Sequence, residues 1–388
     1  MTTAWQEIAE RRRPELRKLV DDQVRPLVVA SERTQEFPAE VLRILGKNGF
    51  LSIGAPVEQG GGGGGRTAEA MVVEELTRAS AGLTMSVVPI FIVRIAIFEF
   101  GGPRLIEELG SKVIAGERIV GICMSEPDAG SDVASITTKA VRVKGEGGSG
   151  DGWRITGRKM FITNGTIAHD LMVVARIDDA ELGQGIGLFL TETDQPGFGA
   201  TKLDKDASRG SDTTELSLDG CFVPDHRVLG SPSRGFRSAM RVLNGERILS
   251  AARAIQLAED SWSDAVAWAR ASDYESGRAL DYQAYQGPLA AARAELWAAR
   301  LALREVCRLW DTGDAAVEEA SMLKDLSTHV SLRVTREMQL LMGRDGLIQG
   351  SRVARNARDA RLGPVTAGSE QIMHRLVARA QKWPAATR

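Results

Sequence analysis

The sequence is poor in the residues that bind metals and cross-link extracellular proteins. Its 388 residues include only three cysteines, Cys123, Cys221 and Cys307, and four histidines. The cysteines lie far apart, without the short spacing typical of a zinc site. We therefore expect no metal site, no disulfide framework and a reducing compartment, the cytoplasm.

Strong net charge and long apolar segments are also missing. The net charge of −2 at pH 7 gives no general electrostatic reason to bind nucleic acid or an anionic membrane. The most apolar stretch, residues 87–98, is interrupted by Pro89 and Arg94 and is shorter than the roughly 20 residues that span a bilayer. It predicts a buried helix and no membrane span.

Apolar periodicity divides the chain into helical and β parts. Apolar residues recur every three or four positions up to residue 118, alternate between 119 and 229, and return to helical spacing from 230 to 388. The pattern predicts an α+β fold that is mostly α, with long helices at residues 251–271, 282–309 and 315–342. The glycine run at residues 60–65 is interpreted as a flexible surface connection, since no strand precedes it as in a phosphate loop.

Two short blocks in the β part indicate a flavin. The first reads M-S-E-P-D-A-G-S-D at residues 124–132, and the second reads K-M-F-I-T-N-G at residues 159–165. The hydroxyls of Ser125, Ser131 and Thr163 lie beside residues that bend or flatten the backbone. Side-chain and main-chain donors can therefore approach a planar, hydrogen-bonding ring and a diphosphate closely.

These blocks closely resemble the acyl-CoA dehydrogenase family, whose patterns are T-E-P-x-A-G-S-D and K-x-W/F-I-T-N. The resemblance continues in C-F-V-P-D-H-R-V-L-G at residues 221–230, L-N-G-E-R-I at 243–248, R-D-A-R at 358–361 and G-S-E-Q-I at 368–372. It implies an N-terminal helical domain (1–118), a middle β-barrel-like domain (119–229) and a C-terminal four-helix bundle (230–388). It also implies FAD, dehydrogenation of an acyl thioester, an electron-transfer flavoprotein or oxygen as electron acceptor, and a homodimer or homotetramer.

The catalytic base is expected at an uncommon position. Most of the family carries a glutamate just before the C-terminal glycine, where this chain has Ala367. The isovaleryl- and long-chain branches place the base before an arginine on the first bundle helix, as in Glu246-Arg247. Considered without the family, Glu246 is better explained as a surface glutamate that pairs with a basic neighbour, because charged residues on helices are usually solvated. The resemblance favours Glu246 as the base, with its pKa raised by desolvation.

The resemblance also assigns residues to the substrate and the cofactor. The Ala367 N–H is expected to polarise the thioester carbonyl, Asn244 to contact the pantetheine arm, and Arg247 to order the pocket. The residues expected to contact FAD are Ile122, Met124, Ser125, Gly130, Ser131, Phe161, Thr163, Gln339, Gly343, Ser369 and Gln371.

Departures from the family gather at the far end of FAD. The R-x-x-F-G segment that relatives use across the dimer is replaced by residues 272–276, so Ser272 and Glu275 stand for the arginine and the phenylalanine. The Q-x-x-G-G segment keeps only Gln339 and Gly343. FAD is therefore expected to be held either by other residues or weakly, and the missing arginine and phenylalanine favour weak binding.

Three alternatives remain open. The acyl group can be carried by a carrier protein instead of CoA, which would relax selection on nucleotide contacts. A flavin monooxygenase on the same fold would need no base, so Glu246 argues against it. A non-catalytic flavin-binding subunit agrees with the missing anchors but not with the intact ring-binding blocks.

Overall fold

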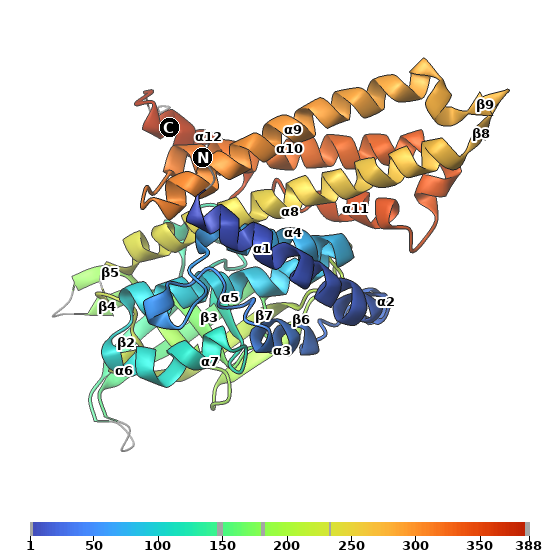
Figure 1. Ribbon diagram of the computed structural model, residues 1–388. Helices are drawn as coiled ribbons and strands as arrows, with labels where there is room; N and C mark the ends of the chain where they lie inside the picture. Colours follow the sequence, from blue (N-terminus) through green and yellow to red (C-terminus); the bar gives the residue numbers. More distant parts are fainter. Residues whose placement is uncertain (1–2, 146–149, 180–182, 233, 385–388) are drawn as a thin grey trace.

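A computed structural model describes residues 3–145, 150–179, 183–232 and 234–384. Along the chain, helices are followed by a curled sheet and then by long helices (Figure 1). The mixed, mostly helical fold predicted from the sequence is confirmed. The helices of the first part are α1 (Ala4–Leu19), α2 (Arg25–Thr34), α3 (Glu40–Lys47), α4 (Gly65–Ala79), α5 (Ala81–Phe100), α6 (Pro103–Leu105) and α7 (Ser111–Ile114).

Helix α5 forms the core of the first part and is longer than the sequence suggested. It runs for 20 residues through both Pro89 and Arg94. By length and mean hydropathy (2.1) it could cross a membrane, but 83% of its most apolar window is buried inside the protein. Arg94 is accommodated because its guanidinium pairs with the carboxylate of Glu69 on α4, which also accepts a 2.5 Å hydrogen bond from Arg66. The prediction of a buried helix is confirmed, and only its predicted length was wrong.

The sheet lies against α5 and carries the two blocks. Its strands are β1 (Val120–Cys123), β2 (Lys139–Val143), β3 (Gly152–Thr163), β4 (Asp170–Asp179), β5 (Gly183–Glu192), β6 (Phe198–Lys202) and β7 (Thr213–Pro224). The strand order is β1-β4-β2-β3-β7-β6, with β5 paired to β4. The first block follows β1 and the second ends β3. Trp153 and Phe189 fill the sheet core, with ring centroids 5.3 Å apart.

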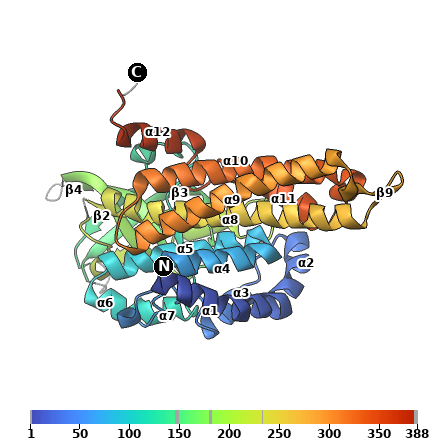
Figure 2. The ribbon, with the colours of Figure 1, turned by 45° about the horizontal axis from the view of Figure 1, so that its top comes forward.

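The last part is a bundle of long helices. It contains α8 (Gly235–Ala271), α9 (Gln283–Asp311), α10 (Val317–Leu341), α11 (Arg352–Ala360) and α12 (Glu370–Ala380), with a small hairpin of β8 (Asp273–Tyr274) and β9 (Gly277–Arg278). Figure 2 shows α8, α9 and α10 side by side above α4 and α5, with α1 to α3 below. Because α8 contacts α4, α5, β5 and α10, it connects all three parts.

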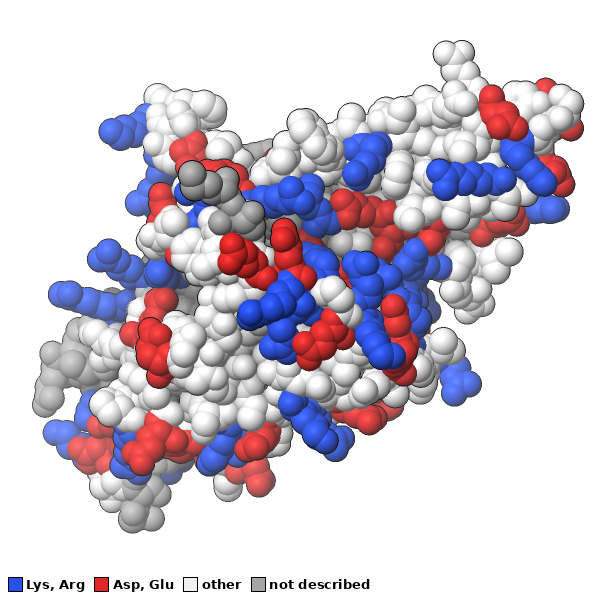
Figure 3. Space-filling model, viewed as in Figure 1, with Lys and Arg blue, Asp and Glu red and all other residues white. Residues whose placement is uncertain are grey.

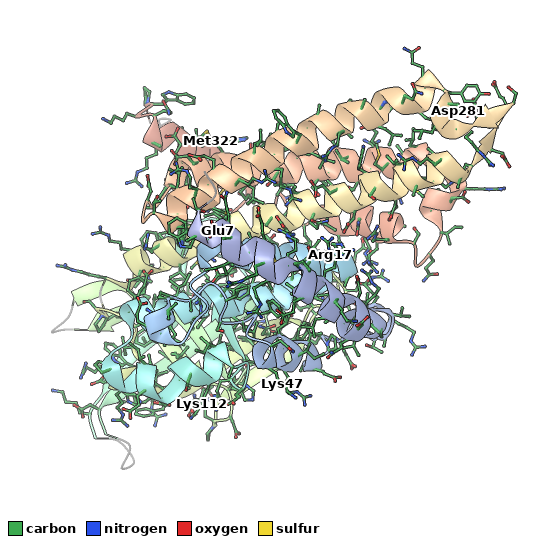
Figure 4. All side chains as sticks on the ribbon, viewed as in Figure 1. Glu7, Arg17, Lys47, Lys112, Asp281 and Met322 are labelled. Atoms are coloured by element: carbon green, nitrogen blue, oxygen red, sulfur yellow. The ribbon has the colours of Figure 1, made fainter. Side chains whose placement is uncertain are left out.

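Charged side chains of both signs intermingle between α1 and the bundle (Figure 3). Arg17 on α1, labelled in Figure 4, binds Glu75 of α4 at 2.8 Å, and Arg13 binds the same carboxylate at 2.9 Å. Glu75 is buried, so these arginines compensate its charge where the helices pack.

The glycine run at residues 60–65 is not a flexible connection. Gly61, Gly62, Gly63 and Gly64 donate their N–H groups to carbonyls of residues 52–56 at 2.8–3.0 Å. A Cβ at Gly61 would lie 2.2 Å from the Ala55 carbonyl oxygen, so a larger residue cannot occupy this position. The glycines therefore form a close-packed turn that leads into α4.

Asp311, the last residue of α9, caps α4 across this turn. Its carboxylate accepts hydrogen bonds from Arg66 N (2.5 Å), Thr67 N (3.1 Å) and Thr67 Oγ1 (2.6 Å). Asp311 thus satisfies donors at the start of α4 from a residue distant in sequence.

We expect Asp311→Ala to lower the free energy of unfolding by about 1–2 kcal/mol, because the first turn of α4 loses its acceptor. Differential scanning calorimetry of the variant measures this effect. The control is Asp204→Ala, which removes an exposed carboxylate that is hydrogen-bonded to no other described residue. Equal stability of the two variants would show that the cap does not contribute.

Candidate active site

A buried ion pair joins the two blocks of the sheet. Glu126 and Lys159 are 5% and 0% exposed, and their charged groups lie 2.9 Å apart. The Glu126 carboxylate also accepts hydrogen bonds from Thr137 N (2.7 Å), Thr137 Oγ1 (2.8 Å) and Thr138 N (3.0 Å). Lys159 in turn donates to the Met124 carbonyl at 3.0 Å. Burial alone would raise the pKa of Glu126, but these hydrogen bonds and Lys159 lower it to about 2.

The second block then turns Phe161 outward. The β3–β7 register shifts between Lys159 and Ile162, and Phe161 has φ 59° with 71% of its surface exposed. A left-handed backbone at a bulky residue is strained, and such strain concentrates at functional sites. Nearby, Met160 N donates to the Ser125 carbonyl at 2.9 Å. The structure thus brings Ser125 and the Phe161 segment together.

The hydroxyls predicted to face the flavin are available. The side chains of Ser125 and Thr163 are half-buried, and neither hydroxyl is hydrogen-bonded within the described residues. Ile122 and Met124 are partly buried against the core beside them. The site therefore presents free hydroxyls next to apolar side chains, a combination that fits the edge and face of a planar heterocycle.

The first block also meets the C-terminal segment. Ser131 Oγ and Ser369 Oγ lie 3.4 Å apart, although 238 residues separate them in sequence. Ser369 caps α12 by accepting from Ile372 N at 3.4 Å. Gly130 and Gln371 are exposed nearby in sequence. A surface at this junction combines hydroxyls with a helix N-terminus.

Glu246 lies on α8 and is half-buried. Its carboxylate makes no hydrogen bond or ion pair with another described residue. Burial raises its pKa above the usual 4.5, and the positive charges of Arg247, Arg253 and Lys324 only partly oppose this effect. A partly desolvated carboxylate without a partner is suited to accept a proton. The pairing expected of a surface glutamate is not present.

The loop at Ala367 and Gly368 lies next to Arg247. A Cβ on Gly368 would be 4.0 Å from Arg247 Nε, an atom that is buried without a hydrogen bond in the described chain. Ala367 has φ 57°, and its N–H donates to no described residue. Arg247 Nη1 donates to Asn244 Oδ1 at 3.2 Å, and Asn244 Nδ2 donates to the Ala315 carbonyl.

Lys324 is a site residue that the sequence did not reveal. It is fully buried on α10, two residues beyond Met322 (Figure 4), and donates from Nζ to the Gly368 carbonyl at 2.6 Å. Burial lowers its pKa to about 8. No motif marked it, because a single lysine on an amphipathic helix resembles a solvated residue.

Gln339 and Gly343 lie at the opposite end of the bundle. Gln339 Nε2 donates to the Gly346 carbonyl at 3.1 Å, and Asp345 accepts a 2.8 Å hydrogen bond from Trp268 near the end of α8. This end carries the β8–β9 hairpin, next to Asp281 in Figure 4. Ser272 ends α8 here, and Glu275 is exposed with φ 49°. One chain therefore does not bring these residues to Ser125 and Thr163.

Comparisons with known proteins agree with this architecture. Residues 7–117, 121–221 and 233–382 match the acyl-CoA dehydrogenase N-terminal, middle and C-terminal domains, respectively. Mitochondrial isovaleryl-CoA dehydrogenase from Oryza sativa subsp. japonica is 32% identical over 93% of this chain and 88% of its own length. Butyryl-CoA dehydrogenase from Megasphaera elsdenii has a TM-score of 0.92 at 26% identity, covering 98% and 100% of the two chains. A glutaryl-CoA dehydrogenase from Mycobacterium smegmatis in complex with FADH2 has a TM-score of 0.90 at 26% identity, covering 100% and 97%.

We expect Glu126→Gln to destabilise the protein by about 3–5 kcal/mol at neutral pH, because Lys159 would stay buried without its counter-ion. The folded pKa of Glu126 of about 2 lies below its ordinary value of 4.5, so this stabilisation is complete above pH 4.5 and is lost as the pH falls toward 2. Unfolding measured across this range should show a weaker pH dependence in the variant.

The control for this prediction is Glu215→Gln. Glu215 pairs with the exposed Arg158 on the same sheet, and loss of an exposed pair typically changes stability by at most about 1 kcal/mol. Combining Glu126→Gln with Lys159→Met should recover part of the lost stability. A single variant as stable as the control would contradict the importance of the buried pair.

Proposed function

The chain belongs to the acyl-CoA dehydrogenase family and is an oxidoreductase flavoenzyme, and on this premise we propose that it dehydrogenates an acyl thioester between its α- and β-carbons with Glu246 as the base. The observation that carries the proposal is the half-buried Glu246 carboxylate, which has a raised pKa and no partner in the described chain. The next residue, Arg247, lies beside the Ala367–Gly368 loop, which supports a shared site.

Glu246 removes the α-proton, and the loop makes that proton more acidic. The free N–H of Ala367 donates to the thioester carbonyl oxygen, where negative charge develops as the proton leaves. Lys324 fixes the loop through the Gly368 carbonyl, so the donor is oriented before substrate arrives. Asn244 and Arg247 hold the adjoining wall through their mutual hydrogen bond.

The residues of the sheet fit FAD. Ser125 and Thr163 offer free hydroxyls to the ring, Phe161 extends an exposed aromatic side chain, and Ile122 and Met124 supply apolar contacts. Gly130, Ser131, Ser369 and Gln371 are suited to the diphosphate side, where hydroxyls meet the start of α12. When bound, the flavin supplies the acceptor for the hydride that leaves the β-carbon.

The remaining assignments concern other molecules: a second copy of the chain, the electron acceptor and the carrier of the acyl group. Gln339 and Gly343 lie too far along the bundle to share a flavin with Ser125 of the same chain, which favours a homodimer or homotetramer in which they hold the far end of a neighbour's FAD. The electron acceptor is an electron-transfer flavoprotein or oxygen. A carrier protein in place of CoA is the second candidate for the thioester, favoured by the replaced residues Ser272 and Glu275.

We expect Glu246→Gln to keep its fold and flavin while kcat falls by about 10²–10⁴-fold, because the base is lost with little change in shape. In the unmodified enzyme, kcat/KM should rise with pH around a value above 4.5, since the raised pKa must be exceeded before Glu246 accepts a proton. Stopped-flow flavin bleaching by acyl-CoA substrates measures both effects.

The matched control is Glu259→Gln on the same helix. Glu259 pairs with Arg300, away from the Ala367–Gly368 loop, so its loss should leave turnover close to that of the parent enzyme. Turnover by Glu246→Gln within a few-fold of this control would remove Glu246 from the mechanism.

We also expect the purified protein to be partly free of flavin, because Ser272 and Glu275 provide neither a cation for the diphosphate nor an aromatic ring for the adenine. Its unfolding temperature should rise as FAD is added, since FAD binds only the folded state. Ser272→Arg should tighten FAD, whereas Ser276→Arg, which adds the same charge nearby on the exposed hairpin, should not.

The measurement is the ratio of flavin to protein absorbance after extensive dialysis, together with an FAD titration. Stoichiometric flavin after dialysis would contradict weak binding. Other residues would then have to hold the diphosphate and adenine of FAD. They would be sought in the cavity of about 720 Å³ between α10 and α11, whose lining includes Gln339, Arg333, Arg336, Arg358 and Arg361.

A further inference from the structure

We infer that the acyl group carries a carboxylate at its far end, and that Arg253 receives it. This inference rests on the proposed function, because it names the class of acyl chain that the Glu246 site accepts. Arg253 lies on α8 seven residues after Glu246, a spacing that returns to the same helix face, and only 4% of its surface is exposed.

The contacts of Arg253 lack a carboxylate. Its Nη1 meets the thioether sulfur of Met85 on α5, and its Nη2 lies 3.5 Å from Thr366 Oγ1. A thioether is a weak acceptor, and the Thr366 hydroxyl is itself engaged, donating to the Leu362 carbonyl at 3.1 Å. A buried guanidinium is normally hydrogen-bonded to a carboxylate or to several carbonyls, and Arg253 donates to neither within the described chain.

The acidic groups near Arg253 are not hydrogen-bonded to it. Asp359 Oδ1 instead accepts from Ser208 N at 2.8 Å and from Arg358 Nε at 2.9 Å. Glu246, about two turns earlier on the same face of α8, has no hydrogen bond to any described residue. The negative charges of Asp359 and Glu246 therefore act on Arg253 at longer range, and neither carboxylate is hydrogen-bonded to it.

None of the three buried cations around Glu246 is hydrogen-bonded to a carboxylate of the described chain. Arg247 donates to the Asn244 side chain, Lys324 donates to the Gly368 carbonyl, and Arg253 has only the contacts given above. Asp359 and Asp325 lie within electrostatic range of Arg253 and Lys324, but they are hydrogen-bonded to Arg358 and His374, respectively. An acyl chain that ends in a carboxylate would give Arg253 a hydrogen-bonded counter-charge, which an uncharged acyl chain cannot supply.

A further polar residue, Ser250, is half-buried on α8 between Glu246 and Arg253. A pocket for a plain alkyl chain would be expected to be apolar here. The seven-residue step along α8 corresponds to about 10 Å at 1.5 Å per residue, which suits an acyl chain of several carbons.

The test compares thioesters that differ only in the terminal carboxylate. Glutaryl-CoA is matched with pentanoyl-CoA, and adipyl-CoA with hexanoyl-CoA. Dissociation constants are measured by calorimetry on the Glu246→Gln holoenzyme, which cannot turn the ligands over. We expect the carboxylated member of at least one pair to bind about 10- to 100-fold more tightly, as for a buried charge-assisted hydrogen bond.

Variants of Arg253 test whether this residue causes the tighter binding of the carboxylated thioesters. Arg253→Met in the same background should abolish it, and Arg253→Lys should keep part of it. Arg270→Met, which removes an exposed arginine from the same helix, should leave it unchanged. The inference would be overturned if the carboxylated and the uncarboxylated acyl groups of both pairs had equal dissociation constants, whether carried on CoA or on pantetheine. If the unmodified enzyme bound the carboxylated thioesters preferentially but did not dehydrogenate any of them, this would instead count against the proposed function alone.

Thermal unfolding separates a ligand receptor from a structural counter-ion. If Arg253 binds an anionic ligand and has no structural counter-ion, Arg253→Met removes a buried unpaired charge. Without ligand, this variant should therefore unfold at the same temperature as the parent or at a higher one. Adipyl-CoA should then stabilise the parent more than this variant. A marked fall in the unfolding temperature of Arg253→Met would show that Arg253 serves Asp359 or the fold, and would overturn the inference.

Discussion

The buried pair of Glu126 and Lys159 is the interaction on which the cofactor side of the site depends. A carboxylate and an ammonium group can be buried together only when their remaining hydrogen-bonding capacity is filled, here by Thr137, Thr138 and the Met124 carbonyl. Met124 belongs to the first block, whereas Thr137 and Thr138 immediately precede β2. The pair therefore fixes the loop after β1 against the end of β3, and the outward turn of Phe161 follows from that fixed register.

The base side of the site is built differently. Glu246 is carried by α8, the helix that contacts all three parts of the chain, so its position depends on the packing of the whole molecule. The loop that supplies the Ala367 N–H is anchored by one buried lysine, Lys324. The charges of the Glu126–Lys159 pair have partners within the protein, whereas the carboxylate of Glu246 and the N–H of Ala367 have no partner among the described residues.

The features that could be predicted from the sequence are those that depend on local patterns of residues. Alternation and helical periodicity predicted the order of helices and strands, and the two blocks predicted that Ser125, Thr163 and Phe161 gather. It did not reveal Lys324 and Arg253, because a lone charge on an amphipathic helix has the same local pattern whether it is solvated or buried. The glycine run misled for a related reason, since its hydrogen bonds to residues 52–56 and the Asp311 cap arise only after the chain folds.

The two regions therefore differ in how their buried charges are compensated. In one region the protein supplies the counter-charge, and in the other we propose that the ligand supplies it. In the sheet, each buried charge of the central pair has its counter-charge within the fold, so this region can form without a ligand. Around Glu246, none of the buried cations Arg247, Arg253 and Lys324 is hydrogen-bonded to a carboxylate of the described chain, and the proposed terminal carboxylate of the ligand would supply one. A site that is electrostatically incomplete without its ligand gains selectivity, because a ligand without the compensating charge must leave the buried cations as they were.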